Sequence, residues 1–283
     1  MMLGARITFS AFLLACAVGR AAAATPDAPS CDACPMLAAT TEGPASPKTI
    51  DPAPQTTEIE VGSSYENLGN GFNHWRSVYL EGVHRFAPRE VIYGHMRETE
   101  RFAQRDQELL GGFYYPLADT WTTLVEANAS PSHHILAKWS VFGQLEKSFP
   151  GGWGLHAGLR HTEYAQSNTN LALLTAERYF GDFRAAYSLY SGRPEGAGSA
   201  ASHRFQFSYY YGDRSSVGIA YTIGKEVENV APAGVLTTDV RDWGLLGRHW
   251  FSRHWAVSFE ALWHEQGALY SRRGARAGLR YQF

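Results

Sequence analysis

Beyond its first 24 residues, the chain lacks any apolar run that could cross a bilayer as a helix, which takes about 18 residues or more. It also lacks a strong charge of either sign, because 25 basic and 27 acidic residues give a formal net charge of −2. Without a basic surface, the protein is not expected to bind nucleic acid. Cysteine is scarce, and no set of cysteines and histidines has the spacing of a zinc site. We therefore expect neither a metal nor another cofactor.

Residues 1–24 have the three parts of a secretory signal peptide. A basic residue precedes an apolar run at 7–18, which is too short to span a bilayer, and the alanines at 21–24 offer small residues for cleavage. The sequence Leu-Leu-Ala-Cys at 13–16 partly fits a lipoprotein signal, and this alternative stays open. Sec-type export with ordinary signal cleavage is the first expectation.

Residues 25–55 are rich in proline, alanine and threonine, a composition typical of disorder. Here Cys31 and Cys34 could close a small disulfide in an oxidising compartment or remain idle thiols. A thioredoxin-like redox site would need a βαβ setting, which the sequence does not provide. We expect a disordered periplasmic leader.

The last fourteen residues, 270–283, alternate between an apolar and a cationic face. One face carries Leu279, Tyr281 and Phe283, and the other carries Arg272, Arg276 and Arg280. Arginines at this spacing suit a barrel with lipid outside and water inside. We therefore predict an all-β fold, an antiparallel up-and-down transmembrane barrel in the bacterial outer membrane, with Leu279, Tyr281 and Phe283 as the signal for the barrel-assembly machinery. A soluble sandwich or lipocalin-like barrel is the alternative.

Alternating segments predict about fourteen strands, between 12 and 16, in one barrel domain at 56–283. Their expected ranges are 57–67, 73–86, 90–102, 107–117, 120–129, 135–149, 153–164, 170–180, 183–191, 203–211, 215–226, 238–251, 255–265 and 270–283. Every second connection is tight and flanked by aromatic residues, which is typical of a periplasmic rim. The other connections, notably 193–202 and 227–235, are expected to be outward-facing loops.

Closure of the sheet would pair the first strand with the last and bring Glu58 and Glu60 near Arg276 and Arg280. The candidate lumen-lining residues are Glu58, Glu60, Arg160, Arg184, Arg204, Glu260, Arg272, Arg276 and Arg280. Inward acids concentrate in early strands and inward arginines in later ones, which predicts an electric field across the pore. Two interpretations stay open: a salt-bridged wall that neutralises buried charge, and a filter that aligns a polar solute.

Two charged residues, Lys147 and Glu177, do not fit the alternation. The strand that contains Glu177 and Arg178 could be read on either face. A charge that faces lipid near mid-depth costs about 2 to 4 kcal/mol. We therefore expect a bulge or a shifted register at one of these positions.

Several segments carry a family likeness: ERYFGDFRAAY at 177–187, GRHW at 247–250 followed by Trp255, and LYSRRG at 269–274 ahead of GLRYQF at 278–283. With these segments, the region from residue 57 onward resembles the YaiO-type outer-membrane β-barrel family. The resemblance implies fold and location, and the surface-polysaccharide settings of some relatives suggest a link to polysaccharide. The leader with Cys31 and Cys34 lies outside the resemblance.

The predicted strand number favours a channel. About fourteen strands lie between the filled barrels of eight strands and the aqueous porins of sixteen or more, so a narrow passage is expected. We interpret the chain first as a channel for ions or small polar solutes, short glycans included, surrounded by outer-membrane lipid. A structural barrel whose leader docks a partner of an envelope export assembly is the second interpretation.

A lipid-modifying enzyme is the least favoured alternative. Candidate histidines lie at 133–134, at His161 and at His264. A hydrolase needs a nucleophile and a base within hydrogen-bond reach, and the predicted faces put no serine beside His161. Glu58 and Glu60 could mimic a glycosidase pair, but neighbouring arginines would keep both ionised, whereas acid catalysis needs one protonated. We therefore expect no catalytic residue.

Overall fold

The computed structural model describes residues 55–195, 199–212, 214–230 and 234–283, without the side chains of 228–230 and 234–235. These residues form fourteen β-strands. The strands are β1 (Thr56–Leu68), β2 (Trp75–Ala87), β3 (Glu90–Arg101), β4 (Gln104–Ala118), β5 (Trp121–Ala129), β6 (Trp139–Phe149), β7 (Trp153–Glu163), β8 (Asn168–Phe180), β9 (Phe183–Pro194), β10 (Ala200–Tyr211), β11 (Ser215–Val230), β12 (Gly234–Trp250), β13 (Trp255–Gln266) and β14 (Tyr270–Gln282). The predicted signal peptide, Cys31, Cys34 and all but the last residue of the predicted leader lie outside the described residues.

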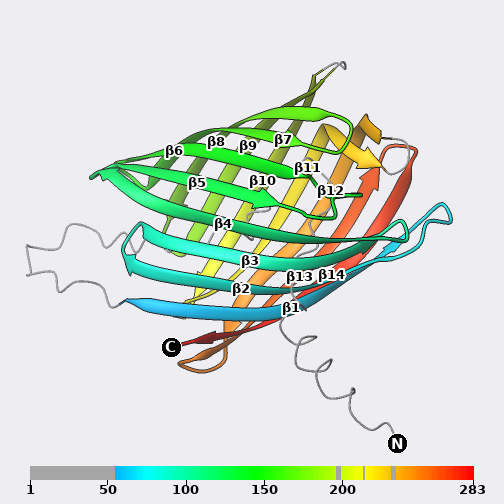
Figure 1. The fold of residues 1–283 in the computed structure, drawn as a ribbon. Coiled ribbons are helices and arrows are strands. Elements are labelled where there is room, and N and C mark those ends of the chain that lie inside the picture. The colour runs from blue at the N-terminus through cyan, green and yellow to red at the C-terminus, as the bar shows by residue number, and fades with distance from the viewer. Residues whose placement is uncertain (1–54, 196–198, 213, 231–233) are drawn as a thin grey trace, which may run out of the picture.

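All fourteen strands belong to one closed antiparallel sheet (Figure 1). Each strand pairs with its neighbours in sequence, and β1 pairs with β14 to close the barrel, with Val61 opposite Leu279. Figure 1 shows this closure as blue β1 beside red β14. A closed sheet leaves no strand edge unpaired, as a backbone in hydrocarbon requires. The predicted fourteen-stranded barrel is confirmed.

Side chains alternate between the lumen and a lipid-facing outer surface. Leu159 on the outside is 70% exposed, whereas Tyr79 on the inside is 0% exposed. The outward positions of neighbouring strands are apolar, so the outer surface forms a continuous apolar band. The described part of the chain contains no helix that is long and apolar enough to cross a membrane.

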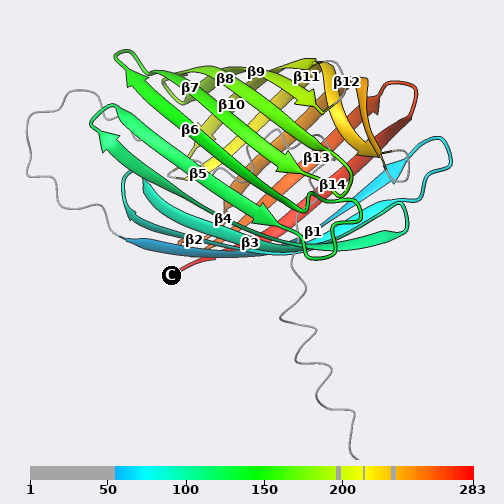
Figure 2. The ribbon, with the colours of Figure 1, turned by 45° about the horizontal axis from the view of Figure 1, so that its top comes forward.

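The two ends of the barrel differ in their connections (Figure 2). The end with the tight turns also carries the start of β1 and the end of β14. There the Phe283 N–H donates to the Thr57 carbonyl at 2.9 Å. Exposed aromatic residues surround it: Phe149, Trp153, Phe180, Phe183, Phe251 and Trp255. Short turns and an aromatic girdle identify the periplasmic end. Tyr114, near one of the tight turns, is not part of this girdle; it is 3% exposed and faces inward, because strand alternation puts Tyr115 outside.

Strands extend into both of the predicted outward loops. β9 continues to Pro194 and β10 begins at Ala200, while the pairing of β11 with β12 continues as far as Val230 opposite Gly234. Pairing with a neighbour satisfies the backbone there, even though the residues are polar or small. The predicted strand at 135–149 begins only at Trp139, because the N–H groups of residues 135 and 136 donate to a side chain instead of the ladder.

The charges that did not fit the alternation divide between the two faces. Glu177 points into the lumen, where its Oε2 lies 2.7 Å from Nε of Arg184. Arg178 and Lys147 face outward at the periplasmic girdle, each over a tryptophan ring. Near the interface a lipid-facing cation costs only about 0 to 1 kcal/mol. The expected bulge is absent, and β6 and β8 pair with both neighbours without a register shift.

Candidate functional site

Arg280 on β14 is the centre of a buried ionic cluster where the barrel closes. Its Nε lies 2.6 Å from Oε2 of Glu60, its Nη1 lies 2.6 Å from Oε2 of Glu58, and its Nη2 lies 2.7 Å from Oε1 of Glu81. The register puts Glu60 directly opposite both Arg280 and Glu81. The Arg280 side chain is 3% exposed, so carboxylates replace water as the partners of its charge.

Glu60 connects this cluster to the middle of the lumen. Its Oε1 accepts hydrogen bonds from Tyr79 Oη at 2.6 Å and Ser258 Oγ at 2.5 Å. The same oxygen lies 3.5 Å from Nη2 of Arg276, whose guanidinium is 4.3 Å from the centroid of the Tyr79 ring. Gly278 leaves room for this arrangement, since a Cβ there would lie 2.5 Å from Tyr79 Oη. The small residues of β14 therefore let the carboxylate lie across the seam.

A second set of ion pairs lines the wall from β3 to β7. Nη2 of Arg97 lies 2.7 Å from Oε1 of Glu108, which Nε2 of His95 also contacts at 2.9 Å. Nη2 of Arg160 lies 2.8 Å from Oε1 of Glu126. These arginine and glutamate side chains are at most 6% exposed. Each arginine has a carboxylate partner, so this part of the wall is neutralised.

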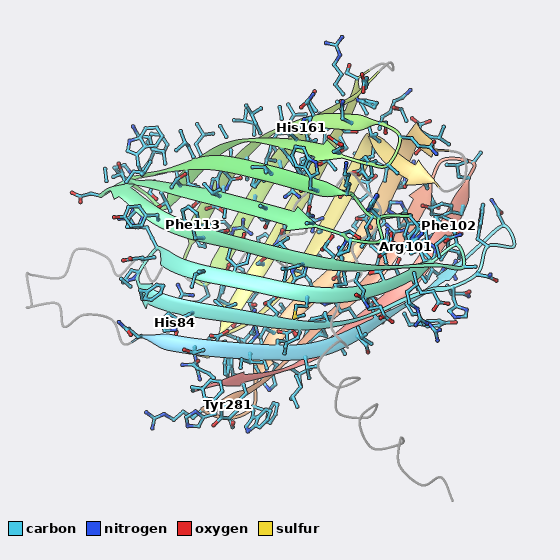
Figure 3. The ribbon with its side chains drawn as sticks, viewed as in Figure 1. His84, Arg101, Phe102, Phe113, His161 and Tyr281 are labelled. Carbon is cyan, nitrogen blue, oxygen red and sulfur yellow. The ribbon has the colours of Figure 1, made fainter. Side chains whose placement is uncertain are left out.

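Aromatic and cationic side chains gather at the extracellular mouth. Trp75 lies between Arg101 and Arg272, whose guanidinium groups are 4.6 and 5.1 Å from the centroid of its ring. Nη1 of Arg272 lies 2.6 Å from Oε2 of Glu66. Figure 3 shows Arg101 at the opposite end of the barrel from Tyr281. This cluster narrows the lumen where it opens outward.

The connection between β5 and β6, residues 130–138, folds against the same mouth. The carboxylate of Asp106 is 0% exposed and accepts the N–H groups of Ile135 at 2.7 Å and Leu136 at 2.9 Å. It also lies 2.8 Å from Nδ1 of His134. Because Asp106 is on the lumen face of β4, these bonds hold the loop over the lumen.

Part of the lumen wall is apolar. The inward cluster comprises Val83, Val91, Tyr93, Leu110, Tyr114, Leu124, Phe142, Leu171, Leu173 and Tyr190, on β2 to β9. Phe142 is 1% exposed and lies under the guanidinium of Arg160, 4.9 Å from its ring centroid. This cluster shares the wall with the ion pairs of Arg97 and Arg160, so apolar and charged side chains together fill this side of the lumen.

The structure places the remaining lumen candidates on the inner face as well. Arg184 contacts Glu177, Arg204 is opposite Ser188 in the ladder, and Glu260 is opposite Arg276. The C-terminal residues Leu279 and Phe283 face outward, 41% and 65% exposed, and Tyr281 packs on Trp255 with ring centroids 4.8 Å apart.

Sequence reasoning missed several charged lumen residues, among them Glu66, Arg97, Arg101, Asp106, Glu108 and Asp242. A signal was present on β3, where the outward Ile92 and Met96 place Arg97 on the inner face. The predicted separation of charge was wrong in part. Arginines also face inward from an early strand, and acids such as Glu177 and Asp242 face inward from late strands. The wall therefore consists of paired charges rather than an acidic half and a basic half.

The histidines considered for catalysis have structural contacts. His161 Nδ1 lies 2.8 Å from Oδ1 of Asn170, His264 contacts Gln266, and His133 contacts backbone carbonyl oxygens. In the described ranges, no group of three or more His, Cys, Asp and Glu side chains could hold a metal ion.

Several solved outer-membrane proteins match the chain at low sequence identity. A bacterial polysaccharide outer membrane secretin is 9% identical, with a TM-score of 0.52 over 80% of this chain and 98% of that chain. OmpF of Salmonella typhi, in complex with daunomycin, is 9% identical, with a TM-score of 0.46 over 81% of this chain and 97% of that chain. An anion-selective porin from Comamonas acidovorans is 11% identical, with a TM-score of 0.46 over 81% and 99%.

At these identities the likeness concerns the fold alone. None of the curated proteins matches the chain. The family model of the YaiO membrane beta barrel domain matches residues 56–229, which is more than half of the chain. The protein is therefore an outer-membrane barrel, and it belongs to the YaiO membrane β-barrel family.

Proposed function

We propose that the barrel is a narrow channel for ions or small polar solutes, short glycans included, and that it has no catalytic role. The observation that supports this is a ladder of inward arginines on one strand, Arg272, Arg276 and Arg280. A strand rises about 3.4 Å per residue, so the ladder extends over roughly 27 Å along the strand. With the usual tilt of about 40° this corresponds to roughly 20 Å of depth, so charged groups line the seam through about two thirds of the hydrocarbon core, which is about 30 Å thick.

Paired charges along the seam give a polar solute a charged lining to follow through the lumen. Arg272 and Arg280 are buried against carboxylates, so contact with a solute falls to the residue between them. Arg276 is the most accessible of the three arginines, with its side chain 11% exposed compared with 1% for Arg272 and 3% for Arg280. It would therefore be the one that contacts a passing solute.

The test is single-channel conductance of the folded barrel in planar bilayers, with Arg276→Ala beside the wild type. We expect discrete openings in both. In a KCl gradient the reversal potential of the variant should shift toward cation preference, because a positive charge is lost beside Glu60. Arg273→Ala is the matched control, since Arg273 is on the same strand but faces outward over Trp263.

Two outcomes would contradict the proposal. One is a heat-modifiable, folded barrel that never opens. The other is an open barrel in which Arg276→Ala and Arg273→Ala both keep the wild-type selectivity. If the channel opens as expected, short polysaccharide fragments are the solutes to test next, because relatives of the family occur in surface-polysaccharide settings.

A further inference from the structure

A hollow of about 510 Å³ opens in the lipid-facing surface, across β7 to β12. Its volume falls in the range of roughly 300 to 1,000 Å³ that is common for small-molecule sites. Most of its lining consists of outward apolar side chains: Trp153, Ala176, Phe180, Ala185, Tyr187, Phe205, Phe207, Ile219, Tyr221 and Trp243. It is therefore a site on the membrane side of the wall, separate from the lumen.

The ladder register explains why the surface is hollow here. Ala185 on β9 lies between Arg178 on β8 and Phe207 on β10, and Ala176 on β8 is opposite Tyr187 on β9. The two alanines leave a gap that the surrounding large rings enclose. In a bilayer such a gap is filled by an acyl chain, because leaving it empty would forfeit dispersion contacts on both sides.

Two outward cations lie near the periplasmic side of the hollow: Arg178 on β8, which lines it, and Lys147 on β6, one strand beyond its lining. The guanidinium of Arg178 is 5.1 Å from the centroid of the Trp153 ring, and Nζ of Lys147 is 4.6 Å from that of Trp121. One strand separates them, since Lys147 on β6 is opposite Leu155 on β7. Among the described residues, neither cation has a carboxylate within ion-pair distance. Each has its charge at the level where lipid headgroups meet the girdle.

We propose that this hollow is a binding site for an anionic glycerophospholipid of the periplasmic leaflet. One acyl chain lies over the two alanines between the aromatic rings, and the phosphate lies against Arg178, with Lys147 as the second cation. The positive charge of the site favours an anionic headgroup. The site lies toward the periplasmic end of the barrel, so the lipid belongs to the periplasmic leaflet. This inference is independent of whether the lumen conducts.

The test is native mass spectrometry of the detergent-solubilised full-length barrel, titrated separately with phosphatidylglycerol and phosphatidylcholine of identical acyl chains. We expect the wild type to retain one phosphatidylglycerol molecule and to bind phosphatidylcholine at least tenfold more weakly. A cation near the membrane surface contributes a factor of about five in affinity. Arg178→Ala should therefore weaken phosphatidylglycerol binding about fivefold, and Lys147→Ala with Arg178→Ala about 25-fold.

Two further variants separate the hollow from general charge effects. Ala185→Trp fills the gap without a change of charge and should abolish retention of phosphatidylglycerol. Arg273→Ala removes the outward cation over Trp263, at the extracellular end of β14, and should leave binding unchanged. Heat modifiability on a gel confirms that each variant is folded.

The proposal is overturned if all variants retain phosphatidylglycerol as the wild type does, or if Arg273→Ala weakens binding as much as Arg178→Ala. It is also overturned if phosphatidylcholine binds equally well. A third arm adds lipopolysaccharide. Preferential retention of lipopolysaccharide would assign the hollow to a lipid of the opposite leaflet.

Discussion

At the scale of single residues, Arg280 is the side chain on which the closing seam most depends. It contacts three carboxylates from two strands at 2.6 to 2.7 Å and is almost fully buried. Such a cluster adds little net stability when complete, because desolvation offsets attraction, but removal of one partner leaves buried charge without compensation. Arg280 therefore compensates the negative charge of three inward glutamates at the point where the first strand meets the last.

Arg280→Met should lower the free energy of unfolding by about 3 to 5 kcal/mol, the usual cost of breaking a buried ion pair from one side. Combining it with Glu60→Gln should recover part of that loss, because one uncompensated charge is then removed. Urea unfolding in lipid vesicles, followed by tryptophan fluorescence, measures both.

Arg76→Met is a suitable comparison, because the Arg76 side chain is 55% exposed in its pair with Glu100 and should contribute no more than about 1 kcal/mol. Equal losses for Arg280→Met and Arg76→Met would show that the seam cluster has no special role.

At the scale of the strands, two glycines differ in the space around them: one is closely packed and the other is open. A Cβ on Gly62 of β1 would lie 2.5 Å from the carbonyl oxygen of Ala277 and would collide with Tyr79 Oη. A Cβ on Gly82 of β2 would meet nothing within 4 Å. The first glycine allows β1, β2 and β14 to approach with the ionic cluster between them, whereas the second faces outward.

Gly62→Ala should therefore destabilise the barrel by about 1 to 3 kcal/mol, as overpacking generally does. Gly82→Ala should be neutral or slightly stabilising, because alanine restricts the unfolded chain and costs no space here. The gel temperature at which the folded band disappears compares the two. A Gly82→Ala barrel that melts as early as Gly62→Ala would contradict the inward and outward assignments of β1 and β2.

At the scale of the whole molecule, closure joins residues that are more than two hundred positions apart. The β1 to β14 ladder runs from Glu58 opposite Gln282 to Leu68 opposite Arg272. Every other ladder joins strands adjacent in sequence, so each of those pairings closes a short loop. Closure has the highest cost in chain entropy and is expected to be the last pairing to form.

The register of closure can be tested by cross-linking. In a chain whose three native cysteines are replaced by serine, Ser63→Cys with Ala277→Cys should form a disulfide under mild oxidation, because the ladder puts these positions opposite each other. The disulfide closes a large covalent loop in the chain. On a denaturing gel the oxidised chain therefore migrates differently from the reduced chain. Ser63→Cys with Arg273→Cys, four residues out of register, is the control. Cross-linking of the control pair with equal yield would contradict the register.

How much could be read from the sequence depended on how the strands were patterned. On β14 and β1 apolar and charged residues alternate over most of the membrane-spanning length, so the faces, the closing partners and the Glu60 to Arg280 contact followed from it. On β3 and β4 both faces carry charge toward the extracellular end, and Arg97 and Glu108 were missed. Residues 135–138 of the loop were predicted as the start of a strand because they are mostly apolar, whereas the backbone N–H groups of 135 and 136 donate to Asp106.

Residue patterning was enough to derive the class of fold, the location, the strand number and the faces of most strands. Each of these follows from side-chain alternation and the need to satisfy a backbone in lipid, which are local or general constraints. Tertiary structure alone decided which carboxylates surround Arg280, which apolar residues fill one side of the lumen, and where the outer wall is hollow. Those depend on the stagger between neighbouring strands, which brings together residues that no sequence spacing relates.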